Sequence, residues 1–200
     1  MHKLLSGTLL ASAFTFALAS TAFAQDNSRG FMAFFEPDPS VTNPPLAQEE
    51  PQSTREVVDY DGDYAPGSII IDTENKVMYF TLGDGKAVRY YVGVGRPGFE
   101  WNGEVTVGRK AEWPGWTPPP EMLERRPDLP RHMAGGIDNP LGARAMYLYK
   151  NGKDTMFRIH GTNEADTIGQ AVSSGCIRML NADVEDLYTR VKVGTHVVVL

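Results

Sequence analysis

After Gly67, short runs of β-branched and aromatic residues alternate with turn residues. The first two turns are Glu74-Asn75 and Gly83-Asp84-Gly85, so the runs around them are expected to form successive antiparallel hairpins. The predicted strands are Ser68–Asp72, Lys76–Leu82, Ala87–Gly95, Glu104–Val107, Arg144–Lys150, Thr155–His160 and Thr195–Leu200. This pattern restricts the folded part of the chain to a mainly β domain built around a β-sheet.

One helix is predicted near the end of the chain, with Asn181 as the candidate N-cap and Gly194 as the terminator. Its apolar stripe has helical spacing and consists of Val184, Leu187, Tyr188 and Val191. This stripe is expected to be the packing face of the helix.

A proline-rich segment, residues 113–130, interrupts the strand pattern. Proline disfavours strand interiors and helices, so we expect a loop without either. The segment begins with Trp113 and Trp116, which suggests the wall of a substrate groove, although a plain connection is the alternative.

The chain is expected to have three parts. Residues 1–24 have the features of an export signal, with Lys3, an apolar stretch and Ala22-Phe23-Ala24 as the cleavage site. The apolar stretch is short and interrupted, which argues against an uncleaved anchor and leaves no membrane span after cleavage. Residues 25–66, rich in proline and acidic residues, are expected to form a flexible arm, and residues 67–200 one folded domain.

The net charge and the cysteine content of the chain limit the functions that it can have. A net charge of -6 without a cluster of lysine and arginine argues against nucleic acid as a partner. Cys176 is the single cysteine, so an exported form of this chain has no intramolecular disulfide. By itself the thiol is equally consistent with an inert buried residue and with a reactive one.

A histidine near this cysteine favours reactivity. The predicted strand ending at His160 is followed by Gly161-Thr162, and Cys176 comes sixteen positions after His160, within Ser-Ser-Gly-Cys-Ile-Arg. A thiol and an imidazole are the minimal unit of cysteine acyl transfer, because the imidazole takes the thiol proton and returns it to the leaving group. His132 and His196 form no close metal-ligand pair with Cys176 in sequence, so no metal is expected.

The pattern His-Gly-Thr followed by Ser-Ser-Gly-Cys-Ile-Arg resembles the catalytic domain of the L,D-transpeptidases of bacterial peptidoglycan. Asn139-Pro140-Leu141-Gly142, Ala145–Leu148 and Ile168-Gly169 are similar to the YkuD/ErfK-type branch found in Gram-negative bacteria. The resemblance covers residues 67–200. It implies a mixed β-sheet sandwich with one or two short helices and a Pro/Trp-rich loop.

The resemblance also implies roles for the motif residues. Cys176 would be the nucleophile and His160 the general base and then acid. Backbone N–H groups around Gly175 and Cys176 would stabilise the oxyanion, because glycine allows a substrate carbonyl to approach the backbone. Arg178 would organise the site or bind a substrate carboxylate, with a purely structural ion pair as the alternative.

Many relatives have a second histidine where this chain has Ser174. His160 would then act alone, oriented by a backbone carbonyl near Gly161. By the same resemblance, Ser174 and Gly161 are expected to help position the site. Tyr147 is expected to line the substrate groove together with the two tryptophans.

The function that the resemblance implies is transfer of a stem tetrapeptide of peptidoglycan in the periplasm. The terminal D-alanine is lost, and the acceptor is an amine of diaminopimelate or of an envelope protein. No cofactor is expected. The alternatives are an L,D-carboxypeptidase or other cysteine hydrolase of wall peptides, and a non-catalytic wall-binding domain.

Overall fold

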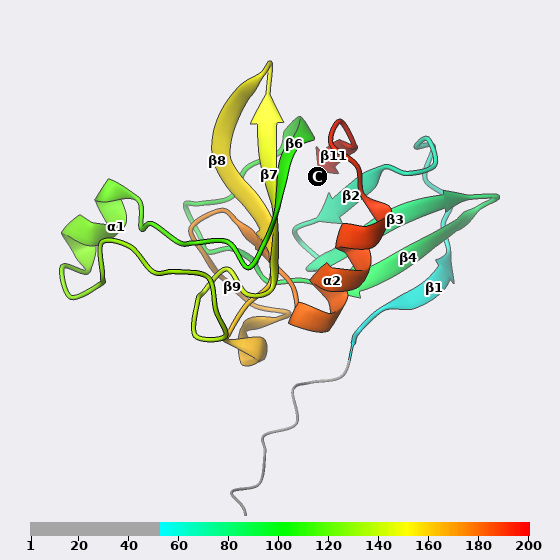
Figure 1. Cartoon of the computed structure of the whole chain (residues 1–200). Coiled ribbons are helices and arrows are strands. Elements are labelled where there is room, and N and C mark those ends of the chain that lie inside the picture. Colours follow the sequence, from blue (N-terminus) through cyan, green and yellow to red (C-terminus); the bar gives the residue numbers. More distant parts are fainter. Residues whose placement is uncertain (1–52) are drawn as a thin grey trace, which may run out of the picture. The chain divides into compact units, whose positions relative to one another are not determined.

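The computed structural model describes residues 53–200, which form a mainly β structure (Figure 1). The predicted signal peptide and most of the predicted arm lie outside the described residues. The strands are β1 (Glu56–Asp59), β2 (Ile69–Asp72), β3 (Val77–Gly83), β4 (Lys86–Tyr91), β5 (Val94–Gly95), β6 (Gly103–Glu112), β7 (Arg144–Lys150), β8 (Lys153–His160), β9 (Ala171–Ser173), β10 (Ile177–Arg178) and β11 (His196–Val199). The helices are α1 (Pro120–Arg125) and α2 (Asn181–Arg190), with a short 3₁₀ turn, η2 (Ala165–Thr167).

Most strands belong to one mixed sheet with the order β1-β4-β3-β2-β11-β6-β7-β8-β10. The predicted hairpins are confirmed, since β2, β3 and β4 pair antiparallel in succession. The last strand, β11, lies in the middle, parallel to β2 and antiparallel to β6. It therefore joins the two halves of the sheet, and the predicted mixed β fold is confirmed.

The two halves of the sheet share one hydrophobic core. Ile71 and Met78 come from one half, and Met146 and Ile159 from the other, and all four are fully buried in the same cluster. Figure 1 shows α2 between the two halves, and its Val184 belongs to the same cluster. Burial of this apolar surface from both halves is the main force that folds the sheet over on itself.

The predicted arm ends earlier than expected. Residues 53–66 were assigned to it, but β1 within this range pairs antiparallel with β4, from Glu56 beside Arg89 to Asp59 beside Lys86. Ion pairs join the side chains at both of these positions. The polar composition of the segment did not indicate a strand, because edge strands are often polar and short.

The proline-rich segment contains a helix, contrary to expectation. α1 starts at Pro120, and proline is well tolerated at the first position of a helix, where its missing N–H has no intrahelical partner. The predicted Asn181 N-cap is also wrong by one residue. Helix α2 is preceded by Leu180, and the side chain of Asn181 accepts a hydrogen bond from the backbone N–H of Ala143 at 2.9 Å.

The run Ala87–Gly95 was expected to be a single strand, but it divides into β4 and β5. β5 leaves the large sheet and pairs in parallel with β9. Between them, Gly93 forms a bridge with Arg178, so this turn of the chain lies directly beside β10. The division of the run thus helps to build the region around Cys176.

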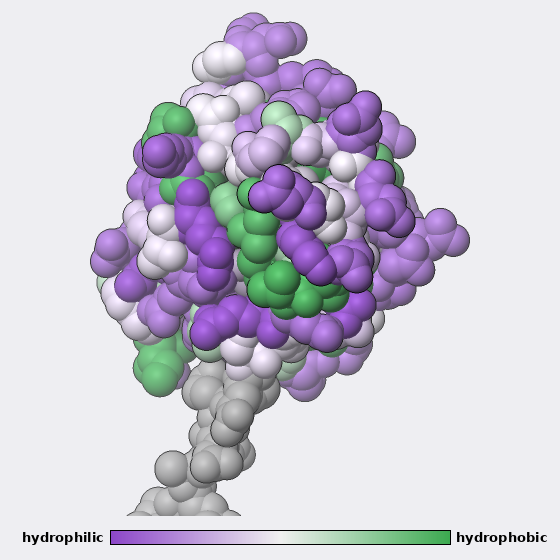
Figure 2. Space-filling view, turned by 90° about the vertical axis from the view of Figure 1, so that its right-hand side faces the viewer, coloured by the Kyte–Doolittle hydropathy of each residue, from purple (hydrophilic) through white to green (hydrophobic). Residues whose placement is uncertain are grey.

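On the face shown in Figure 2 the surface is mostly hydrophilic, with apolar side chains in a few separate groups. Within residues 53–200, no helix combines the length and the hydropathy required to cross a bilayer.

Candidate functional site

The candidate site lies where β8 and β10 pair in parallel, with Ile177 beside Ile159. Both isoleucines are buried in the core. Because side chains alternate along an extended chain, the residues before and after them face away from the core. That face carries four polar or reactive side chains: Arg158, His160, Cys176 and Arg178.

His160 is almost completely buried, with 4% of its surface exposed. Its Nδ1 lies 2.5 Å from the carbonyl oxygen of Gly161. A carbonyl only accepts, so Nδ1 carries the hydrogen and Nε2 has a free lone pair. The pKa of His160 is lowered to about 4, chiefly by burial and also by the charges of Arg178 and Arg158, against the effect of the Gly161 hydrogen bond. The imidazole is therefore neutral near pH 7.

Cys176 is half-buried and has a free thiol. Burial raises the pKa of the thiol, while the backbone N–H of Arg158 and the charges of Arg158 and Arg178 oppose this rise. The contact recorded for Sγ is with the carbonyl oxygen of Met156, at 4.0 Å. No hydrogen bond between Cys176 and His160 is present in the described part of the chain. At neutral pH the resting site thus holds a thiol and a neutral imidazole.

A tight turn before the nucleophile depends on Gly175. Its φ is 104°, and a Cβ there would collide with the ring of Phe157. The carbonyl oxygen of Gly175 accepts a hydrogen bond from Nε1 of Trp101 at 2.8 Å, and its N–H donates to Oγ of Ser173 at 3.1 Å. Of the two N–H groups expected to face an oxyanion, that of Gly175 already has a partner, and that of Cys176 has none among the described residues.

The other two motif residues have structural partners. Oγ of Ser174 accepts a hydrogen bond from Nη1 of Arg96 at 3.0 Å. Nη1 of Arg178 pairs with Glu164 at 2.7 Å and contacts Oγ1 of Thr167 at 3.3 Å. The structural ion pair considered for Arg178 is therefore present, and it ties the segment around η2 to β10.

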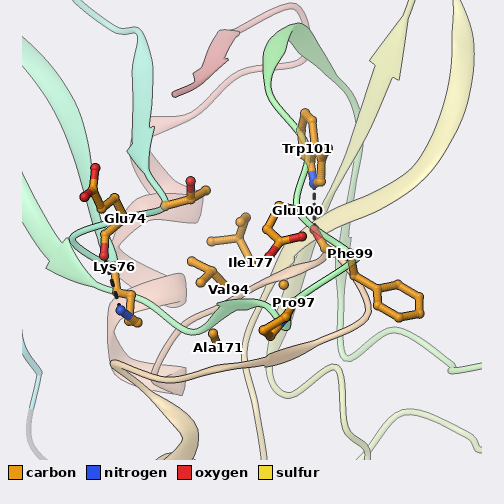
Figure 3. Close-up of a pocket in the computed structure, with 12 residues that line it drawn as sticks. Glu74, Lys76, Val94, Pro97, Phe99, Glu100, Trp101, Ala171 and Ile177 are labelled. Atoms are coloured by element: carbon orange, nitrogen blue, oxygen red, sulfur yellow. Dashed lines mark hydrogen bonds between the residues drawn. The ribbon is translucent and has the colours of Figure 1, made fainter.

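A pocket of about 250 Å³ lies against the same turn (Figure 3). Ile177 and Val94 belong to its apolar lining, Trp101 and Gly175 border it, and Glu100 contributes a carboxylate. Neither Cys176 nor His160 lines this pocket. Because Ile177 points away from the face that carries Cys176, the pocket lies behind the nucleophile.

Trp101 was missed by the sequence analysis, because it belongs to no motif and follows a turn with no regular pattern. Its ring stacks on Phe157, with centroids 4.6 Å apart. This pair, and not Trp113 or Trp116, supports the turn that carries Cys176.

The two tryptophans predicted to line the groove form backbone contacts within and beside their own loop. The N–H of Trp113 donates to the carbonyl of Ala143 at 2.7 Å, and Trp116 bridges to Met133. Within residues 53–200, no recorded contact joins either tryptophan to Cys176, His160 or the pocket. Tyr147, by contrast, lies on the same face of the sheet as Cys176, beside Arg158.

No group of three or more His, Cys, Asp or Glu side chains in residues 53–200 is arranged to hold a metal ion.

A sequence model of the YkuD family, described as the L,D-transpeptidase catalytic domain, matches residues 66–199. Probable L,D-transpeptidase ErfK/SrfK of Escherichia coli K12 is 37% identical over 139 residues, which are 66% of this chain and 43% of that protein. Probable L,D-transpeptidase YcfS of the same strain is 31% identical over 193 residues, 88% of this chain and 57% of that protein. The matched part thus spans about half the length of these relatives.

Two solved structures share the fold. A Brucella melitensis protein described as a probable carnitine operon oxidoreductase has a TM-score of 0.52 and 46% identity, over 76% of this chain and 96% of that one. An L,D-transpeptidase from Mycobacterium smegmatis has a TM-score of 0.52 and 17% identity, over 68% of this chain and 59% of that one. The second match, at this low identity, speaks for the fold alone.

Proposed function

Because the chain belongs to the L,D-transpeptidase catalytic domain family, we propose that it is a cysteine acyltransferase that acts on peptidoglycan stem peptides. The observation that carries the proposal is the placement of Cys176 and His160 on one face of the β8 and β10 pair, beside two arginines. The donor is a stem tetrapeptide, and the acceptor is an amine of diaminopimelate or of an envelope protein. The signal at residues 1–24 would bring the enzyme to the periplasm.

In the first half-reaction, Nε2 of His160 takes the thiol proton while Sγ of Cys176 attacks the carbonyl on the L-centre of diaminopimelate. The N–H of Cys176 supports the oxyanion of the tetrahedral intermediate. The bond to D-alanine then breaks, the imidazolium gives its proton to the leaving amine, and the stem stays on Sγ as a thioester.

In the second half-reaction, the acceptor amine attacks the thioester carbonyl and loses its proton to His160. Collapse of the intermediate forms the new amide and releases the Cys176 sulfur, which takes the proton back. If water takes the place of the amine, the product is a tripeptide, which is the carboxypeptidase alternative.

The electrostatics of the site favour rapid return of the proton. The charges of Arg158 and Arg178 act against an imidazolium at His160. A protonated His160 is therefore a strong acid in this site, and it delivers its proton to the leaving amine readily. The same two charges favour the thiolate at Cys176, but they oppose the imidazolium that forms when His160 takes the thiol proton.

Carbapenem acylation tests the proposed nucleophile and base. The wild-type protein is expected to gain one adduct on Cys176, and Cys176→Ala none, as measured by mass spectrometry. His160→Asn keeps a hydrogen-bond donor near the position of Nδ1 but lacks the base, so we expect acylation to slow by about 10²- to 10⁴-fold.

Ser174→Ala is the matched control, because it lies in the same motif and leaves His160 intact. An equal adduct on Cys176→Ala, or near-normal acylation of His160→Asn, would contradict these roles. Incubation with disaccharide-tetrapeptide and an added amine then separates the outcomes, because dimers indicate transfer and tripeptide alone indicates hydrolysis. A wall-binding domain without activity would give neither.

A further inference from the structure

The face that carries Cys176 also carries a row of cations and an aromatic ring across three neighbouring strands. Arg109 of β6 is in register with Tyr147 of β7, and Tyr147 is in register with Arg158 of β8. The parallel register of β8 with β10 places Cys176 beside Arg158, at the end of the row. The row therefore runs perpendicular to the strands and ends at the nucleophile.

The ring of Tyr147 lies between the two guanidinium groups. Cζ of Arg109 is 3.4 Å from the ring centroid and Cζ of Arg158 is 4.3 Å from it. Tyr147 is 7% exposed as a result. Stacking on an aromatic face holds a guanidinium in place while its N–H groups stay available in the plane. Arg109 is thus pre-organised without a carboxylate partner.

The two arginines differ in how far their hydrogen-bonding capacity is used. Nη1 and Nη2 of Arg158 bind the two carboxylate oxygens of Asp154, at 2.7 Å and 3.0 Å. Arg109 is exposed, and among residues 53–200 it makes neither an ion pair nor a hydrogen bond. Its charge is the uncompensated one in the row, in a chain whose net charge is -6.

We propose that Arg109, stacked on Tyr147, binds a carboxylate of the donor stem peptide. This inference rests on the proposed function. Arg109 is three strands away from Cys176, which is roughly 14 Å at the usual strand spacing. The carboxylate of the terminal D-alanine lies close to the cleaved bond and hence to Cys176. We assign to Arg109 the carboxylate on the part of the stem that precedes diaminopimelate, with the stem lying across the strands and its tail over Tyr147.

The test measures binding and turnover of disaccharide-tetrapeptide. On a Cys176→Ala background, Arg109→Gln is expected to raise the dissociation constant by about tenfold, the usual effect of losing a charge-assisted hydrogen bond. Arg109→Lys should recover part of the loss. In the enzyme with its cysteine, Arg109→Gln should raise KM and leave kcat within about twofold, because the contact is the same in the ground and transition states.

Lys153→Gln is the matched control for net charge, since Lys153 is an exposed cation at the start of β8, outside the row. It should leave the dissociation constant unchanged. Amidation of the stem carboxylate that precedes diaminopimelate should weaken binding to the parent protein but not to Arg109→Gln. Amidation of the terminal D-alanine carboxylate should weaken both equally.

Equal binding by the parent and Arg109→Gln would overturn the inference and leave the proposed function standing. A parent protein that neither binds nor converts the peptide would refute the proposed function, and the inference with it. If Arg109→Gln were insensitive to amidation of the terminal carboxylate alone, the position assigned along the stem would be wrong.

Discussion

At the scale of single residues, the environment of the site shifts the pKa values of two side chains, His160 and Cys176. Burial makes His160 a weaker base than free histidine, and it makes Cys176 a weaker acid than free cysteine. Both shifts favour the uncharged pair, so the site is not an ion pair at rest. A protonated thiol is also less open to oxidation than a thiolate.

The buried, neutral His160 predicts a pH dependence of stability. Its pKa is about 4 in the folded state and near 6.5 when unfolded, so the unfolded chain binds more protons between these values. The free energy of unfolding should therefore fall as the pH drops from about 6.5 to 4, by on the order of 3 kcal/mol from this residue. Urea denaturation at several pH values measures it. The His160→Asn protein should lack this component, and an identical pH dependence in both proteins would contradict the prediction.

At the scale of elements, the short turn between β9 and β10 decides where the nucleophile lies. Its backbone is held by the side chain of Ser173 and by the indole of Trp101, which reaches it from the segment after β5. Elements far apart in the chain thus fix a turn that no regular secondary structure stabilises. Trp101, which supports the turn, also lines the pocket behind it.

Trp101→Phe tests that support. The variant keeps an aromatic ring to stack on Phe157 but loses the hydrogen bond to the Gly175 carbonyl. We expect a loss of about 1 kcal/mol in stability and slower acylation of Cys176, because the turn loses a direct restraint. Denaturation and carbapenem acylation rates give the two quantities. Trp113→Phe is the control, and a larger effect on acylation from it would restore the groove originally assigned to Trp113.

At the scale of the whole domain, the residues before β1 are fastened to the helix near the other end of the chain. Asp183 of α2 is fully buried, and its carboxylate accepts hydrogen bonds from the Ser53 hydroxyl and from the N–H and hydroxyl of Thr54. Nearby, Arg55 pairs with Asp186 of the same helix at 3.7 Å. These contacts attach residues 53–55 to α2 and hold β1 at the edge of the sheet.

Asp183→Asn should therefore destabilise the domain by about 2 to 4 kcal/mol, since an amide group cannot accept all of these hydrogen bonds at a buried position. Thr54→Val removes part of the same contact, so the two changes together should cost less than their sum. A double-mutant cycle measured by urea denaturation checks this. Strict additivity would show that Asp183 and Thr54 do not act together.

The local features could be predicted from the sequence: the hairpins after Gly67, most strands, the α2 stripe, and the spacing of His160 and Cys176. These depend on residues close together in the chain, where periodicity and turn chemistry act directly. The strand β1 and the helix that begins at Pro120 were not predicted from the sequence. β1 is polar and forms because it pairs with β4, and the helix forms because proline is tolerated in a first turn.

The surroundings of the two reactive groups depend on the tertiary structure. The parallel pairing of β8 with β10, the burial that keeps His160 neutral, the partner of Arg178, and the approach of Trp101 all join segments distant in sequence. The row from Arg109 through Tyr147 to Cys176 likewise joins residues that are distant in sequence. Side chains on separate strands become neighbours through register and burial, which depend on the complete core and not on local spacing.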